Sequence, residues 1–300
     1  MCYNGLEGPL LYQGNLTFEP VHLTMELPPL DQVEIALQAY RELQEELRGE
    51  DARPKVDAGE SRPDLAQLLD EIGPLPHGTL LIGVAEDGLP ILHNLHPEDA
   101  DSASPILVTG EAGSGKTALL QTLAAGPDLG SDLSDIQFAV ITNHPEEWTS
   151  LVSLPSALGV WPGYHPSSRH FLLQLANWAE SLHRKRTSVL LLLDGLEVLA
   201  DAGPEAQHDL RSLLMYGPQR GVWPVVAVNA ARAAGMTSWL EHFQSRIFAR
   251  IGDQALAASL TGDPGARLDD LLPGIQFGLQ HPAGWLNFWI PALGAGRSDT

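Results

Sequence analysis

The sequence contains one cysteine, Cys2, among its 300 residues, so it has neither an internal disulfide framework nor a metal site built from cysteines. Basic residues are also few: 17 stand against 38 acidic residues, and the formal net charge is −21. A chain of this charge is not a general binder of polyanions. We therefore expect any contact with nucleic acid to come from a local patch or from a ring of several subunits.

Long apolar runs are missing as well. The longest, such as residues 189–193, are far shorter than the roughly 20 residues that a membrane-spanning helix needs. The first residues lack the basic stretch followed by an apolar stretch that is typical of a signal peptide. We expect a cytoplasmic protein without a membrane span.

The acidic charge is concentrated in the first part of the chain. Residues 1–165 hold 26 acidic and six basic residues, whereas residues 166–300 hold 12 and 11. We interpret the acidic part mainly as a solubilising surface. The hydrophobic content of 44% is enough for one large domain with an appendage. The pattern predicts a strand and helix appendage over 1–50, a charged, proline-bearing linker over 51–65, and a main domain over 66–300.

Only three lysines occur, and one of them lies in a glycine-rich motif of the form G-x-x-x-x-G-K-T. An apolar run at 105–108 precedes the motif, which is the strand, turn and helix context of a phosphate-binding loop, or P-loop. Glycines let backbone N–H groups surround phosphates, the lysine can reach the β- and γ-phosphates, and the threonine hydroxyl can bind Mg²⁺. The sequence therefore predicts binding of ATP with Mg²⁺. The predicted nucleotide-binding residues are Gly110, Glu111, Ala112, Gly113, Ser114, Gly115, Lys116 and Thr117.

A second predicted part of the nucleotide site is Asp194, at the end of an apolar strand. We expect Asp194 to hold Mg²⁺ together with Thr117; its alternative role is to cap the following helix. Many ATPases place glutamate directly after this aspartate to polarise water, but the residue here is Gly195. Glu197 is the nearest acid and Glu111 lies in the loop, so either could substitute. Hydrolysis is thus predicted less directly than binding.

Three further polar residues follow later strands. Asn229 comes after the apolar run 223–228 and could sense the γ-phosphate or serve only as a turn residue. Arg246 and Arg250 lie four apart in an expected strand over 246–251, so both would project to one face. Either could stabilise the transition state at a neighbouring subunit's ATP. A surface ion pair is the alternative role.

Apolar runs alternate with helical segments through the main domain. This predicts an α/β fold: a P-loop NTPase of the RecA/ASCE-like kind, with a parallel sheet flanked by helices and a small N-terminal α+β appendage. A hairpin over 80–92 precedes the P-loop, and an antiparallel pair over 274–290 follows the last helix. The expected strands are 106–109, 136–142, 189–193, 223–228 and 246–251, and the expected helices are 65–72, 116–125, 167–184, 205–215 and 237–244.

The order of several segments resembles the FtsK/HerA superfamily of motor ATPases. The segments are LLIGVAEDGLPILHNL, PILVTGEAGSGKTALLQTLAA, VLLLLDGLEVL, LRSLLMYGPQRGVWPVVAVNAAR, SRIFARIGD and LLPGIQFGL. The resemblance covers roughly residues 79–280. The chain departs from the family's pattern at Gly195, at the end of the second strand (residues 142–145) and after the sensor strand (residues 228–231).

The resemblance implies a homo-oligomer such as a hexameric ring that couples Mg-ATP hydrolysis to the movement of a polymer. The first hypothesis is an ATPase that translocates or remodels double-stranded DNA. The alternatives are a nucleotide-gated assembly module with little hydrolysis, favoured by Gly195, and a protein-export ATPase. Protein partners could bind through residues 1–65.

Overall fold

The structure is a computed structural model that describes residues 62–76, 78–95, 104–130, 135–181, 187–200, 203–281 and 284–294. The chain divides into two units, Met1–Ala52 and Arg53–Thr300, and every described residue belongs to the second unit. The predicted appendage over 1–50 and most of the predicted linker over 51–65 lie outside the described residues.

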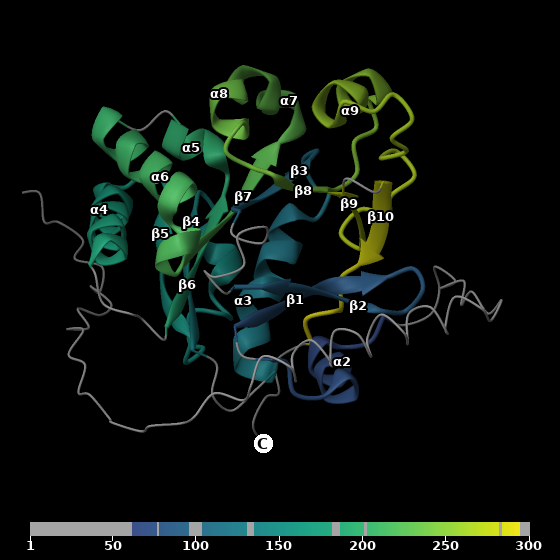
Figure 1. Ribbon diagram of the computed structural model, residues 1–300, viewed down its shortest axis with the longest axis horizontal. Coiled ribbons are helices and arrows are strands. Elements are labelled where there is room, and N and C mark those ends of the chain that lie inside the picture. The colour runs from purple at the N-terminus through teal and green to yellow at the C-terminus, as the bar shows by residue number, and fades with distance from the viewer. Residues whose placement is uncertain are drawn as a thin grey trace, which may run out of the picture. The chain divides into compact units, whose positions relative to one another are not determined.

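Within the described residues, ten strands form one sheet in the order β2-β1-β10-β9-β8-β3-β7-β6-β4-β5 (Figure 1). The six strands from β8 to β5 pair in parallel, and the other four pair antiparallel. The predicted parallel sheet is therefore confirmed, with an antiparallel extension at one side. The strands are β1 (Thr79–Ala85), β2 (Pro90–Asn94), β3 (Ile106–Gly110), β4 (Ile136–Thr142), β5 (Ala157–Pro162), β6 (Ser188–Asp194), β7 (Val222–Asn229), β8 (Ser245–Phe248), β9 (Gln276–His281) and β10 (Gly284–Trp289).

Helices cover both faces of the parallel strands. Residues of α2 and α3 contribute to one core cluster, whereas α4, α5 and α6 contribute to a second one (Figure 1). A third, smaller cluster lies around α9. The described helices are α2 (Leu65–Ile72), α3 (Lys116–Gly130), α4 (Pro166–Glu180), α5 (Leu196–Ala200), α6 (Pro204–Tyr216), α7 (Ala230–Ala233), α8 (Thr237–Leu240) and α9 (Gln254–Thr261), with short 3₁₀ turns that include η1 (Pro145–Trp148).

The central strands are apolar along their whole length because both of their faces are buried. In β6, Leu190 and Leu192 belong to the core cluster on the α3 side, whereas Leu191 and Leu193 belong to the cluster on the α4 and α6 side. All four side chains have no solvent exposure. This arrangement leaves Asp194 as the first polar residue at the strand's carboxyl end.

Three predicted elements end several residues earlier in the structure than expected. The helix expected over 167–184 ends at Glu180, and Ser181 after it is extended. The strand expected over 246–251 ends at Phe248, because the chain then turns into α9. Asp253 caps the N-terminus of α9: its side chain accepts hydrogen bonds from two backbone N–H groups. The helix expected over 237–244 ends at Leu240, because the chain must turn into β8. Strand β5 and helix α9 were not predicted; both are short, and α9 has only a weak apolar stripe.

Residues 62–65, the end of the predicted linker, pair with the last described segment. The Leu65 N–H donates to the Ala292 carbonyl at 2.8 Å, and the Ala292 N–H donates to the Pro63 carbonyl at 3.1 Å. The Arg62 guanidinium donates to the carbonyls of Gly274 and Ile290 at 3.4 and 3.3 Å. The start and the end of the described domain are thus held together.

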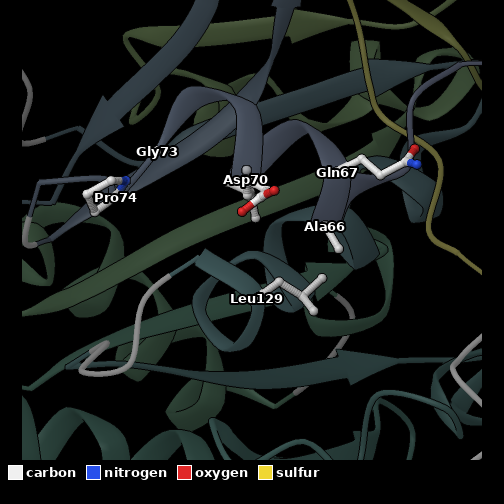
Figure 2. A pocket seen from close by; sticks show the side chains of 7 residues that line it. Ala66, Gln67, Asp70, Gly73, Pro74 and Leu129 are labelled. Carbon is white, nitrogen blue, oxygen red and sulfur yellow. The ribbon is translucent and has the colours of Figure 1, made fainter.

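An open hollow of about 620 Å³ lies between α2 and the end of α3 (Figure 2). It contains none of the predicted nucleotide-binding residues, and we assign it no function. The hollow is lined by Ala66, Gln67, Leu69, Asp70, Gly73, Pro74 and Leu129.

The longest helices of the described part, α3 and α4, have 15 residues each, and no described helix meets the requirements for crossing a membrane.

Candidate nucleotide site

The strand order brings the predicted site residues to one edge of the sheet. Strand β7 lies between β3, which leads into the P-loop, and β6, which ends in Asp194. Gly110 at the end of β3 is in register with Asn229 at the end of β7. Open α/β sheets bind ligands at the carboxyl ends of their strands, and this is the edge where the P-loop, Asn229 and Asp194 meet.

The P-loop has the conformation that its glycines permit. Gly113 and Gly115 have φ angles of +72° and +98°, and α3 begins at Lys116. A Cβ on Gly115 would lie 2.3 Å from the Cα of Gly274, so no side chain fits there. The Gly274 N–H also donates to the Ser114 carbonyl at 2.9 Å. A segment near the end of the chain therefore supports the loop from outside.

Lys116 is folded back onto its own loop. Its Nζ donates to the carbonyls of Gly110 and Glu111 at 3.0 and 2.6 Å. Burial lowers the pKa of the Lys116 ammonium, and the negative charges of Asp194, Glu197 and Glu111 oppose this effect. A bound phosphate would replace the two carbonyls as the partner of the ammonium group.

Thr117 and Asp194 meet directly. The Thr117 hydroxyl donates to both carboxylate oxygens of Asp194, each at 3.1 Å, and the Thr142 hydroxyl donates to Oδ2 at 3.3 Å. Burial raises the pKa of the Asp194 carboxyl, while the hydrogen bonds from Thr117 and Thr142 oppose the rise. An alcohol and a carboxylate oxygen are the hard ligands that Mg²⁺ prefers, so these residues fit the predicted metal.

Glu197, in the first turn of α5, turns back toward Gly195. A Cβ on Gly195 would lie 3.5 Å from the Glu197 Oε2. The other oxygen, Oε1, accepts a hydrogen bond from the Asn229 backbone N–H at 2.8 Å. The Glu197 carboxylate is also near enough to oppose the pKa shift of Lys116. An acid therefore lies beside the position where a side chain on residue 195 would begin.

The Asn229 side chain has a structural contact. Its Oδ1 accepts from the Ala231 N–H at 3.0 Å and so caps the short helix α7. This is the strand-end turn role that the sequence left open. Its backbone N–H contacts Glu197, which links the end of β7 to the start of α5.

The two arginines do not share a strand face, which corrects the expectation from their spacing. The Arg246 guanidinium donates to the carbonyls of Leu240 and Phe243 at 3.2 and 3.3 Å, so it caps the turn after α8. Arg250 lies two residues beyond the end of β8, and its Nε donates to the Asp269 carbonyl at 3.3 Å. The strand that would have aligned them ends too early.

The contacts that hold the P-loop in place were not predicted from the sequence. The Glu111 side chain accepts from the Gly252 N–H at 2.7 Å, and the Glu111 N–H donates to the Arg250 carbonyl at 3.2 Å. The Pro-Gly pair at 273–274 indicates a turn, but no local pattern shows that this turn packs on Gly115. Thr142 had been identified from the sequence only as part of a departure from the family's motif. In the structure its hydroxyl contacts Asp194.

Comparisons with known proteins agree with this geometry. A family model described as an AAA domain matches residues 99–229, which is less than half of the chain. A search of curated proteins found no match. The structure is similar to EssC (ATPases 2 and 3) from Geobacillus thermodenitrificans, with a TM-score of 0.61 and 15% identity over 82% of this chain and 49% of that chain.

Two other solved structures are similar. One is Thermomonospora curvata EccC (ATPases 2 and 3) in complex with a signal sequence peptide: TM-score 0.56, 16% identity, 77% of this chain and 43% of that chain. The other is the pCW3 conjugation coupling protein TcpA, in its monomer form with ATPγS: TM-score 0.54, 13% identity, 78% and 71%. The chain spans about half the length of the EssC and EccC chains. At these identities the likeness establishes the fold.

Proposed function

We propose that this chain, whose P-loop fold is similar to that of the EssC, EccC and TcpA structures, binds and hydrolyses Mg-ATP within an oligomer that moves or remodels a polymer, as ATPases of the FtsK/HerA type do. The observation that carries the proposal is the contact of Thr117 with Asp194 at 3.1 Å, beside the half-buried ammonium group of Lys116. This contact supports the proposal because it brings a P-loop hydroxyl to the carboxylate of a separate strand, and these groups suit a metal bound to phosphate.

The proposed binding step requires Lys116 to change partners. Backbone N–H groups of the loop and the N-terminus of α3 bind the phosphates. Lys116 leaves the Gly110 and Glu111 carbonyls and binds the β- and γ-phosphates. Thr117 and Asp194 would hold Mg²⁺, which would neutralise charge on the phosphate oxygens.

For the hydrolytic step we propose Glu197 as the residue that orients and deprotonates water. Its Oε2 lies beside Gly195, next to the position where related ATPases carry a glutamate. The Asn229 N–H fixes its other oxygen. Asn229 thus connects the end of β7, in register with the P-loop glycine Gly110, to the proposed base, and we propose that it relays the state of the γ-phosphate to Glu197.

Of the two arginines, Arg250 is the better proposal for a residue that acts on a neighbouring subunit's ATP. Within the described residues the Arg246 guanidinium is bound by two carbonyls, whereas Arg250 is bound through Nε. The terminal nitrogens of Arg250 are the groups that would form a bidentate contact with phosphate.

The proposed cargo is double-stranded DNA, and a translocated protein is the alternative. The similar structures belong to both kinds of system: TcpA is a conjugation coupling protein, and EccC was solved with a signal sequence peptide. The balanced charge of residues 166–300 would allow a local contact with DNA, which the acidic first part would not.

A nucleotide-gated assembly module with little turnover is a second candidate, because Gly195 removes the usual glutamate. Steady-state ATP hydrolysis at low salt separates the candidates, with and without duplex DNA and with Lys116→Ala as the blank. The motor proposal predicts turnover that DNA stimulates and the substitution abolishes. Turnover that ignores DNA would favour protein export. ATP binding without turnover would overturn the hydrolytic proposal and leave the assembly module.

A further inference from the structure

The last residue of β4 is buried beside Asp194. Thr142, the last residue of β4, is in register with Asp194 and is only 1% exposed. Its hydroxyl donates to Asp194 Oδ2 and also accepts the His144 backbone N–H at 3.0 Å. Because the hydroxyl has both partners, its orientation toward Asp194 is fixed.

Trp148, at the end of η1, lies beside the same carboxylate. Its side chain is fully buried, and its indole N–H has no hydrogen-bond partner of ordinary length among the described residues. The indole nevertheless lies near enough to Asp194 to lower the pKa of that carboxyl. A buried donor without a partner is unfavourable, so this N–H needs an acceptor. The hydrogen bond from Thr142 holds the Asp194 carboxylate next to the segment that contains Trp148.

The P-loop helix holds Trp148 in place. Gln121 of α3 donates to the Glu147 carbonyl at 2.8 Å, which ties η1 to this helix. Trp148 also belongs to the same core cluster as Leu120 and Leu123 of α3. The indole therefore has a fixed position relative to Thr117, which lies at the start of the same helix.

We infer that Thr142 and Trp148 are positioning residues: together they orient the Asp194 carboxylate from the β4 side, so that it faces Thr117 and would hold Mg²⁺. The inference rests on the proposed Mg-ATP site and adds two residues that do not themselves touch the nucleotide. Outer-shell hydrogen bonds of this kind typically change metal affinity by about 10–100-fold.

The test compares Trp148→Phe with Trp223→Phe. Trp223 is a matched control because its indole N–H is also buried without a partner among the described residues. It lies near the amino end of β7, whereas Asp194 lies at the carboxyl end of the neighbouring strand β6, and its ring is edge-on to His93. The affinity for a fluorescent, slowly hydrolysed ATP analogue is measured once with Mg²⁺ and once with EDTA. The ratio of these two affinities measures the coupling between metal binding and nucleotide binding. We expect Trp148→Phe to lower this ratio about tenfold, with the EDTA affinity unchanged, and Trp223→Phe to leave the ratio as in the wild type.

A second pair covers the case in which Trp148→Phe does not fold. Thr142→Val removes the hydroxyl and keeps the shape, whereas Thr142→Ser keeps the hydroxyl, so only the first should lower the ratio. An unchanged ratio in Trp148→Phe, or in Thr142→Val if the former does not fold, overturns the inference. A wild-type protein that shows no advantage from Mg²⁺ would instead overturn the proposed Mg-ATP site, and the inference with it.

Discussion

At the scale of single residues, the candidate site contains two half-buried ionisable groups, Lys116 and Asp194, whose partners belong to the protein itself. The Lys116 ammonium is bound to two carbonyls of its own loop, and Asp194 is bound to hydroxyl groups. The burial that lowers the pKa of the lysine also raises that of the aspartate. Both shifts disfavour the charged forms, so a bound phosphate and metal would relieve both.

Glu197→Gln tests the proposed base. Glutamine keeps the acceptor oxygen for the Asn229 N–H but cannot take a proton from water. We expect ATP turnover to fall about 100-fold or more, with the affinity for Mg-ATP little changed. Glu205→Gln, an exposed acid in the first turn of α6, is the control and should behave as the wild type. Equal turnover in both variants would show that another group replaces the missing glutamate.

His93 makes the stability of the fold depend on pH. Burial lowers the pKa of His93 to about 4, so it stays neutral in the folded chain while the unfolded chain gains a proton below about 6.5. The stability that the neutral His93 contributes to the fold is fully present above pH 6.5 and is lost as the pH falls toward 4. At pH 5 the free energy of unfolding should be about 2 kcal/mol lower than at pH 7 from this group alone.

Chemical denaturation at pH 7 and at pH 5 measures this effect. His93→Phe, which keeps a ring against Trp223, should remove most of the acid loss, whereas His208→Gln, at an exposed position, should not. The same acid loss in all three proteins would contradict the assignment to His93.

At the scale of elements, the P-loop depends on the turn that contains Gly274. Gly113→Ala and Gly115→Ala both place a side chain at positive φ, at a cost of roughly 1–2 kcal/mol. Only the second also meets the backbone of Gly274, at 2.3 Å, whereas Gly113 faces open space. We expect Gly115→Ala to be less stable than Gly113→Ala by a further 1–3 kcal/mol or so. Thermal unfolding of the two variants without nucleotide tests this, and equal stability would mean that the turn moves aside freely.

The local pattern of the sequence predicted the central elements well. Strand β4 has the predicted limits, β3 is one residue longer at one end, and β6 and β7 are one residue longer at each end. The agreement is close because a doubly buried strand is one unbroken apolar run. Strand β8 was predicted too long, because Ala249 and Ile251 are buried outside the strand. Apolar character alone does not show where pairing stops.

The site was predictable only where a motif fixes it. The P-loop context was legible in the sequence, and so was the acid at the end of β6. The contacts of Thr142 with Asp194, of Gly274 with Ser114 and of Gly252 with Glu111 join segments 52 to 160 positions apart. Such contacts depend on how the strands are ordered, which a local pattern does not contain.

At the scale of the whole molecule, the proposed oligomer would complete each site with a neighbour's arginine. Arg250→Ala and Glu197→Gln should each show strongly reduced turnover alone. If Arg250 acts across a subunit boundary, mixed rings contain some sites with both native residues, so mixing the two variants should restore part of the turnover. Light scattering on the same samples measures whether rings form. Mixed rings without restored turnover would show that Arg250 does not act on a neighbour's ATP.

The position of β7 between β3 and β6 also constrains how the chain is made. Val222, where β7 begins, follows Gly110 by 112 positions, so the ribosome releases β3 and β6 before the strand that separates them exists. Until then both strands present unpaired apolar edges, which favour aggregation. The centre of the sheet therefore cannot form until β7 has been synthesised and pairs with β3 and β6. The loop that would bind ATP is synthesised long before the strands that position it are paired.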